Sequence, residues 1–308
     1  MALALWKSKR LLTRRQREAS WSAFTKWLRK KTPIPEISVP VCLEFLTQLQ
    51  EKGFAAGTVK AYKNSLTVPW RLLNVNSSSW EFSDMIKSTF IENPPIRKYV
   101  PKWELEKVID LLRSPKFSVN PSDFARLQKT LLLVSIATGN RSSELAAIES
   151  SSIQTDHRGA RMAVRPGFIY KNQTQSRTPP VIEFPRLPEN LSLCPVKNLE
   201  DYLKFHNIIN GPLFRNSKTK APLNAGSIAH ILCKLIDEAD PGKFPRAHDV
   251  RKRAASLAWA RGVPITEICS RAFWASSTTF INRYLHTVPD EISLIALSSV
   301  DTKAHVKA

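Results

Sequence analysis

The stretch HDVRKRAASLAWARGVPITEICSRAFWASSTTFINRYL, from His248 to Leu285, places a histidine, an arginine and a tyrosine on two predicted helices. His248 and Arg251 are three positions apart, so they share one face of a helix that Gly262 ends. Tyr284 follows in a second segment, where apolar residues recur at helical spacing. The stretch therefore predicts a helical region that can direct an imidazole and a guanidinium at one phosphate.

A second arginine comes from an earlier segment, TGNRSSEL, in which Arg141 precedes Glu144 by three positions. Cleaving a phosphodiester without a metal ion requires a nucleophile, a stabiliser of negative charge and a proton donor. The phenol of Tyr284 can attack phosphorus, but with a pKa near ~10 it needs a base or a positive field. Arg141 and Arg251 supply that field, because each guanidinium can bind two phosphate oxygens. His248 titrates near neutrality and can carry a proton to or from the reacting oxygens.

Trp274 and Glu144 can support this site. The indole N–H of Trp274 can donate to a phosphate oxygen, or the ring can pack beneath the site as a core residue. The carboxylate of Glu144 can orient either Arg141 or His248. Each of these residues has an ordinary structural explanation when taken alone, so the catalytic interpretation depends on the whole set occurring in this order.

Lys171 can supply the proton for the leaving oxygen, because it lies at the mouth of a predicted hairpin. The segments Met162–Tyr170 and Val181–Phe184 have the composition of strands, and the polar stretch KNQTQSRT between them predicts a turn. The sequence does not fix the register of this hairpin, so Lys197 and Arg177 are alternative donors.

The charge of the chain indicates a polyanionic partner. The 308 residues carry a net charge of +20, with 17 basic and 7 acidic residues in positions 1–100 and 29 and 19 in the remainder. Each part is strongly basic, which favours two lobes that both contact nucleic acid over a basic tail on a neutral body.

The first 92 residues predict a helical DNA-binding domain. Apolar residues at helical spacing indicate four helices, which lie around Ala19–Leu28, between Ser38 and Gly53, from a capping Thr58 to Trp70, and after Ser83, where the helix includes Met85, Ile86 and Phe90. The basic, proline-bearing stretch that follows suggests a linker over residues 93–103.

The second domain, residues 104–308, is predicted to be mixed. Helices are expected over Leu105–Leu112 and Leu127–Ala137 and again from Leu199 onward, with a C-terminal tail from about residue 288. Together with the two predicted strands, this gives an α+β chain that is mainly helical with a small antiparallel β-sheet.

A run of basic residues between Lys7 and Lys31 holds ten basic side chains and one acidic one, Glu18. A solvated helix face and a nuclear import signal are alternative interpretations, but the excess favours contact with the DNA backbone. The residues expected to bind DNA are Arg14, Arg15, Arg17, Lys26, Lys30, Lys60, Lys63, Arg97, Lys98 and Lys252.

The four cysteines, Cys42, Cys194, Cys233 and Cys269, lie far apart. Their spacing excludes an ordinary zinc finger and does not suggest a disulfide framework. The chain contains no apolar run of membrane-spanning length and no signal peptide, so a soluble protein in a reducing, intracellular compartment is expected.

These motifs match a known family. TGNRSSEL around Arg141 resembles the first arginine box of the tyrosine recombinases, the phage integrase family, and HDVR resembles the second. Trp274 and Tyr284 match the later His/Trp position and the nucleophile. The resemblance covers the whole chain, since the N-terminal helices and basic linker look like the core-binding (SAM-like) domain of that family.

The resemblance implies a C-shaped clamp of two domains around double-stranded DNA. Tyr284 would form a 3′-phosphotyrosine and release a 5′-hydroxyl, so that no metal, ATP or other cofactor is needed. Protomers would bind one site as a homodimer and exchange strands as a homotetramer through a Holliday junction. The catalytic roles would fall to Arg141, Lys171, His248, Arg251, Trp274 and Tyr284, with Glu144 in support.

Within the family, HDVRKRAASLAWARG and FWASSTTFINRYL are similar to the recombinases of DIRS-like tyrosine-recombinase retrotransposons. Trp274 stands where histidine is usual, and its gap to Tyr284 is one residue longer than is typical. This similarity implies a site-specific recombinase or integrase of a mobile element, acting in a nucleus. The alternatives are a type IB topoisomerase, a catalytically inactive DNA-binding derivative and, more weakly, a histone-like or RNA-binding basic protein.

Overall fold

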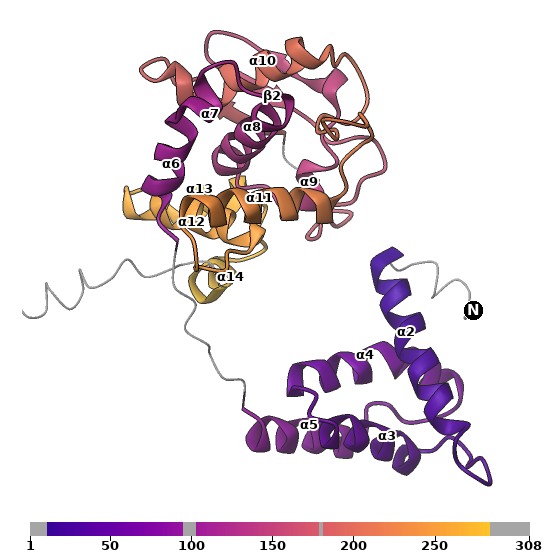
Figure 1. Ribbon diagram of the computed structural model, residues 1–308. Helices are drawn as coiled ribbons and strands as arrows, with labels where there is room; N and C mark the ends of the chain where they lie inside the picture. The colour runs from indigo at the N-terminus through magenta and orange to yellow at the C-terminus, as the bar shows by residue number, and fades with distance from the viewer. Residues whose placement is uncertain (1–10, 95–102, 179–180, 284–308) are drawn as a thin grey trace, which may run out of the picture. The chain divides into compact units, whose positions relative to one another are not determined.

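A computed structural model describes residues 11–94, 103–178 and 181–283 (Figure 1). The chain forms two compact units that divide between Tyr99 and Val100, inside the stretch expected to be a linker. None of the described helices is both long and apolar enough to cross a bilayer.

The described part of the first unit contains four helices, α2 (Leu11–Leu28), α3 (Val39–Glu51), α4 (Ala56–Leu72) and α5 (Trp80–Glu92). Aromatic side chains pack against one another in their core. The ring of Trp70 stacks on Phe82 with centroids 5.4 Å apart and meets Phe24 edge-on at 5.7 Å. Such pairs add about 0.5–1.5 kcal/mol each beyond the burial of their area, so these rings hold α2, α4 and α5 together.

Two helix starts in this unit differ from expectation. α4 begins at Ala56, with Ala55 as its N-cap, so Thr58 lies in the first turn and does not cap the helix. α5 begins at Trp80, earlier than Ser83. This earlier start includes Phe82, which is buried in the core, whereas Phe90 is 53 % exposed.

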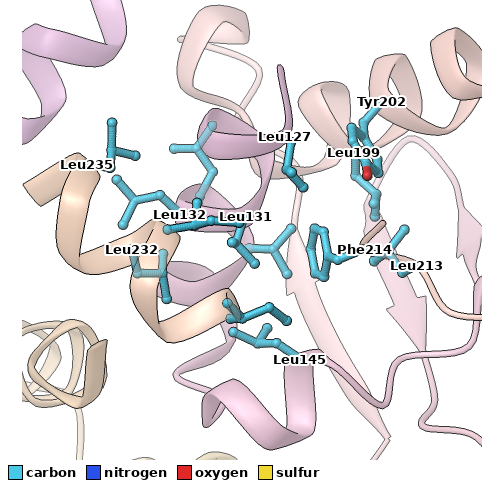
Figure 2. Close-up of a cluster of buried hydrophobic side chains, with 14 of the residues drawn as sticks. Leu127, Leu131, Leu132, Leu145, Leu199, Tyr202, Leu213, Phe214, Leu232 and Leu235 are labelled. Carbon is cyan, nitrogen blue, oxygen red and sulfur yellow. The ribbon is translucent and has the colours of Figure 1, made fainter. Parts of the chain in front are cut away.

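The central helix of the second unit is α8 (Asp123–Thr138). The helices described in this unit besides α8 are α6 (Leu105–Arg113), α7 (Pro115–Ser118), α9 (Ser142–Leu145), α10 (Pro195–His206), α11 (Ala225–Ala239), α12 (Ala247–Ala260), α13 (Ile265–Arg271) and α14 (Ser277–Arg283), with short 3-10 turns at Ser150–Ser152 and Leu191–Leu193. Of these, α10, α11 and α12 pack against α8. α8 is buried on nearly all sides, and Figure 2 shows its leucines between those of α11 and the side chains of α10. The expected helices at Leu105, at Leu127 and before Gly262 are confirmed.

α8 is delimited by a cap at each end. The Ser122 hydroxyl accepts the backbone N–H of Ala125 at 3.2 Å, and Gly139 adopts the left-handed conformation (φ 61°) directly after the last turn. Glycine populates that region without the steric cost that other residues meet. The chain therefore turns sharply out of the core at Gly139, and Arg141 follows at once.

The sheet has three antiparallel strands in the order β1 (Gln154–Thr155), β2 (Gly159–Met162) and β3 (Ile182–Pro185). Gly159 pairs with Pro185 and Met162 with Ile182. Ala160, Met162, Ile182 and Phe184 are buried on one face, as the period of a half-buried sheet requires. A chain that is mainly helical with a small antiparallel sheet is the fold class expected from the sequence.

The strand predicted over Met162–Tyr170 is wrong, because β2 ends at Met162. Pro166 has no N–H to offer a partner strand, and Gly167 takes a positive φ of 78° in the turn that follows. The described part of the connection from β2 to β3, residues 163–178 and 181, consequently contains turns and isolated bridges and no further strand. We call it the β2–β3 loop.

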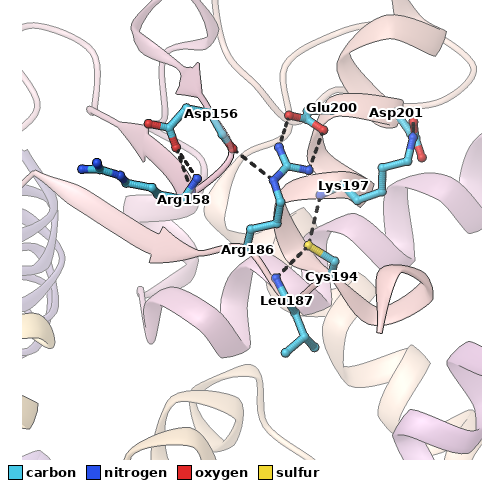
Figure 3. A network of polar contacts seen from close by, with 9 residues as sticks. Asp156, Arg158, Arg186, Leu187, Cys194, Lys197, Glu200 and Asp201 are labelled. Carbon is cyan, nitrogen blue, oxygen red and sulfur yellow. Dashed lines mark hydrogen bonds and ion pairs between the residues drawn. The ribbon is translucent and has the colours of Figure 1, made fainter. Parts of the chain in front are cut away.

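A polar network joins the end of β3 to α10 (Figure 3). Arg186 binds the carboxylate of Glu200 through two nitrogens, at 2.5 and 3.2 Å, and donates to the carbonyl of Asp156 at 3.0 Å. The buried thiol of Cys194 accepts the backbone N–H of Leu187 at 3.2 Å. These contacts fasten the sheet to the helical core.

Candidate active site

Arg141 and Glu144 form the first half of the site. Arg141 is the N-cap of α9, and its backbone N–H donates to the Glu144 carboxylate at 2.8 Å. The Arg141 guanidinium binds the same carboxylate at 2.5 Å. Glu144 is only 2 % exposed, and its buried carboxylate is held by both the backbone N–H and the guanidinium of Arg141. Of the two partners expected for Glu144, Arg141 is the one it contacts through these bonds.

Arg251 forms the second half and comes from α12. Its side chain is 2 % exposed, and one of its terminal nitrogens lies 3.8 Å from the Glu144 carboxylate. The guanidinium also donates to the main-chain carbonyls of Gly139 and Ala272. One buried carboxylate therefore lies between two guanidinium groups that are far apart in the sequence, and the cluster keeps a net positive charge.

Trp274 packs beneath Arg251. The guanidinium lies 4.7 Å from the centre of the indole, and the indole stacks on Phe280 with centroids 5.4 Å apart. Trp274 is 2 % exposed, so the ring is a core element of this region. A cation over a desolvated indole is stabilised by about 2 kcal/mol. This geometry gives Trp274 a packing role, whether or not its N–H also meets a phosphate.

His248 lies at the start of α12 and is exposed to solvent on one side. Its pKa is lowered to about 4, first by desolvation of the face that packs on the protein and then by the positive charges of Arg251, Lys252 and Arg141. The imidazole is therefore neutral at neutral pH in the free protein. It can accept a proton once an anion offsets the surrounding positive charge.

Lys171 lies in the β2–β3 loop and is exposed. Both alternatives are engaged in other contacts. Lys197 forms an ion pair with Asp201 at 2.6 Å along α10 (Figure 3), and Arg177 donates to the carbonyl of Trp274 at 2.7 Å. Of the three, Lys171 is the one whose side chain extends into solvent from the loop that reaches Trp274.

Tyr284 lies outside the described residues, as do Arg97 and Lys98 of the expected DNA contacts and the whole tail from residue 288. Arg15, Lys26, Lys30 and Lys60 are exposed on the first unit, where Arg14, Arg17 and Lys63 are half-buried. Lys252, on α12, lies 3.4 Å from Asp249 and close enough to His248 to lower the pKa of the imidazole.

Sequence reasoning missed Asn172 and Phe273, which support the site, and named Arg177 only as an alternative proton donor. Asn172 donates to the carbonyl of Phe273 at 2.9 Å, Phe273 has a positive φ of 50°, and the Arg177 guanidinium lies 4.3 Å from the centre of the Phe273 ring. A bulky residue in the left-handed region costs roughly 1–2 kcal/mol, so the surroundings must impose it. Nothing in the sequence marks this conformation, because its causes lie in the distant β2–β3 loop.

Among the described residues, no group of three histidine, cysteine or acidic side chains is arranged to hold a metal ion. The side chains that converge are two guanidiniums, an imidazole and a carboxylate. Such a set can bind a phosphodiester and stabilise the additional charge that its oxygens acquire when the phosphorus is attacked.

Comparison with protein-family models and with curated proteins gives no match. Solved structures do match along most of the chain. The XerH site-specific recombinase bound to palindromic difH substrate has a TM-score of 0.64 at 16 % identity, covering 95 % of this chain and 80 % of that one. The chain has the tyrosine recombinase fold.

Two other structures with the tyrosine recombinase fold agree. The Tn1549 transposon integrase in complex with circular intermediate DNA has a TM-score of 0.59 at 14 % identity, covering 92 % of this chain and 93 % of that one. A lambda integrase dimer bound to a core site has a TM-score of 0.57 at 13 % identity, covering 92 % and 91 %. The fold that the sequence motifs implied is thus confirmed.

Proposed function

We propose that this protein is a site-specific DNA recombinase of the tyrosine recombinase family, the integrase of a mobile element. The observation that carries the proposal is the position of Glu144 between Arg141 and Arg251, because it gathers two guanidiniums from distant helices around one buried carboxylate. The net charge of +20 and the DNA-bound relatives support double-stranded DNA as the substrate.

In the proposed reaction, the phenolic oxygen of Tyr284 attacks phosphorus and the bond to the 5′ oxygen breaks. The product is a 3′-phosphotyrosine and a free 5′-hydroxyl. Arg141 and Arg251 bind the non-bridging oxygens, His248 accepts the proton that the Tyr284 phenol loses, and Lys171 protonates the leaving oxygen. The phosphotyrosine retains the bond energy, so rejoining needs no ATP and no metal ion.

Covalent trapping tests the proposal. A nicked substrate that loses its 5′-hydroxyl fragment after cleavage should accumulate a protein–DNA adduct with the natural sequence. Tyr284→Phe should bind the same DNA with unchanged affinity and form no adduct. An adduct that persists in Tyr284→Phe would refute the assignment of the nucleophile. No adduct with the natural sequence would favour an inactive DNA-binding derivative.

The oligomeric states form a second part of the proposal. A homodimer would bind one site, and a homotetramer would synapse two sites and pass through a Holliday junction. Deleting the residues after Pro289 should abolish synapsis and spare the binding of single protomers. Plasmid relaxation without synapsis or junctions would instead favour a type IB topoisomerase.

The most specific part of the proposal concerns the kind of mobile element that encodes the protein. The sequences of the two C-terminal motifs, HDVRKRAASLAWARG and FWASSTTFINRYL, support a recombinase of a DIRS-like retrotransposon. Such an enzyme would act in the nucleus of a eukaryotic cell. A tagged protein that stays in the cytoplasm of such a cell, or a flanking region that lacks a reverse transcriptase, would contradict it.

A further inference from the structure

Three consecutive main-chain carbonyls after α13 each accept a hydrogen bond from a distant side chain. The pairs are Ala272 with Arg251, Phe273 with Asn172 at 2.9 Å, and Trp274 with Arg177 at 2.7 Å. Two of the donors belong to the β2–β3 loop and the third to α12. The turn at residues 272–274 therefore connects the loop that carries Lys171 to the helix that carries His248 and Arg251.

Phe273 is the centre of this connection. It is 5 % exposed and adopts a φ of 50°, which a phenylalanine takes only when its surroundings impose it. Its ring meets Tyr170 edge-on with centroids 5.5 Å apart, and the Arg177 guanidinium lies 4.3 Å from its centre. Two residues of the loop thus enclose the ring, while Asn172 holds the carbonyl.

These contacts restrain the main chain at Lys171, which lies between Tyr170 and Asn172. The residue before it packs on the Phe273 ring, and the residue after it binds the Phe273 carbonyl. The main chain of Lys171 is therefore fixed on both sides by one buried residue, while its own side chain remains exposed. The long, flexible ammonium side chain of Lys171 therefore extends from a main chain that is held in place.

We propose that Phe273 anchors Lys171 at the reacting phosphate, and that Asn172 and Arg177 are positioning residues for proton transfer to the leaving oxygen. This rests on the proposed function of the site. When the bond from phosphorus to the 5′ oxygen breaks, the electron pair stays on that oxygen and the proton comes from the Lys171 ammonium, which becomes a neutral amine. Displacing a catalytic group by about 1 Å can cost on the order of 10²-fold in rate.

The experiment compares two DNA substrates that differ in the leaving atom. One has the ordinary phosphodiester at the cleavage site, and the other has sulfur in place of the bridging 5′ oxygen. A thiolate leaves without taking a proton, so a defect in proton donation is bypassed on the sulfur substrate, whereas a defect in phosphate binding is not. Single-turnover adduct formation is the readout, with DNA affinity and thermal unfolding measured in parallel.

Asn172→Asp and Arg177→Met should each form adduct about 10- to 10²-fold more slowly on the ordinary substrate and near the natural rate on the sulfur substrate. Lys171→Ala should show the same pattern with a larger defect. Arg177→Lys keeps a cation that can reach the Trp274 carbonyl, so it should recover much of the lost rate. Gln175→Ala, at the exposed tip of the same loop, is the matched control and should behave as the natural sequence on both substrates.

Equal slowing on both substrates would overturn the inference, because the loop residues would then act on phosphate binding through Trp274 and Arg251. Unchanged rates on both would overturn it as well. If the natural sequence forms no adduct on either substrate, the proposed function itself fails, which is a distinct result.

Discussion

The guanidinium of Arg251 lies 4.7 Å from the centre of the Trp274 indole, with both side chains only 2 % exposed. Trp274→Phe keeps an aromatic face beneath the cation, so we expect adduct formation to stay within about 10-fold of the natural rate. Trp274→Ala removes that face and leaves a cavity, and should lower stability by roughly 3–5 kcal/mol and abolish most cleavage. Single-turnover trapping and thermal unfolding measure the two effects.

Trp259→Phe is the control for this pair, since Trp259 lies on α12 and is 39 % exposed. A folded Trp274→Phe protein that loses 10²-fold or more in rate would show that the indole N–H binds phosphate. The hydrogen bond of Trp274 to phosphate would then contribute more to cleavage than the packing of its ring does.

Glu144→Gln should destabilise the second unit. It keeps the shape of the side chain but removes the charge between Arg141 and Arg251, which leaves a guanidinium buried without its counter-ion. Breaking a buried pair in this way costs about 3–5 kcal/mol, or roughly 6–20 °C in Tm for a unit of this size. Glu183→Gln breaks the exposed pair with Arg161 and should cost under ~1 kcal/mol. Equal losses of stability in Glu144→Gln and Glu183→Gln would contradict the position of Glu144 between the two guanidiniums.

His248 should titrate near pH 4 in the free protein, because its pKa is lowered from 6.5 to about 4. The unfolded chain takes up this proton first as the pH falls. The stability that His248 contributes is therefore complete above about pH 6.5 and is lost between that value and about 4. Its imidazole resonances, assigned by comparison with His248→Asn, report the midpoint directly.

Binding of DNA should raise the pH midpoint at which the His248 imidazole titrates. A phosphate offsets the positive charges of Arg251, Lys252 and Arg141. The unfolding free energy of the natural protein should also fall relative to His248→Asn as the pH drops below 6.5. A midpoint near 6.5 in the free protein would contradict the positive surroundings of the ring.

The helical part of this site could be predicted because its signals are local. The spacing of His248 and Arg251 and the stop at Gly262 are both patterns that lie within one or two helical turns. The β2–β3 loop could not be predicted in the same way. The composition of Met162–Tyr170 indicated a strand, whereas Pro166 and Gly167 end the pairing. The bonds from Asn172 and Arg177 reach carbonyls about a hundred positions away, which no local pattern encodes.

Arg186→Lys should weaken the second unit without changing DNA cleavage. Lysine cannot reproduce the two bonds to Glu200 together with the bond to the Asp156 carbonyl. The loss should be about 1–3 kcal/mol in chemical denaturation. Arg158→Lys, at an exposed position nearby, should have little effect on stability. A drop in adduct formation at a temperature where Arg186→Lys is fully folded would mean that the network also serves the site.

Lys26→Gln combined with Lys30→Gln should reduce the salt dependence of DNA binding. Both side chains are exposed on the first unit, and the expectation is that each neutralises one phosphate. The slope of log K against log salt changes by about 0.9 for each phosphate contact, so the double variant should lose ~1.8 in slope and bind all sequences more weakly. Lys87→Gln is the matched control, because Lys87 already pairs with Asp84 at 3.0 Å. Equal slopes for the double variant and the control would place these two lysines on a solvated face, away from DNA.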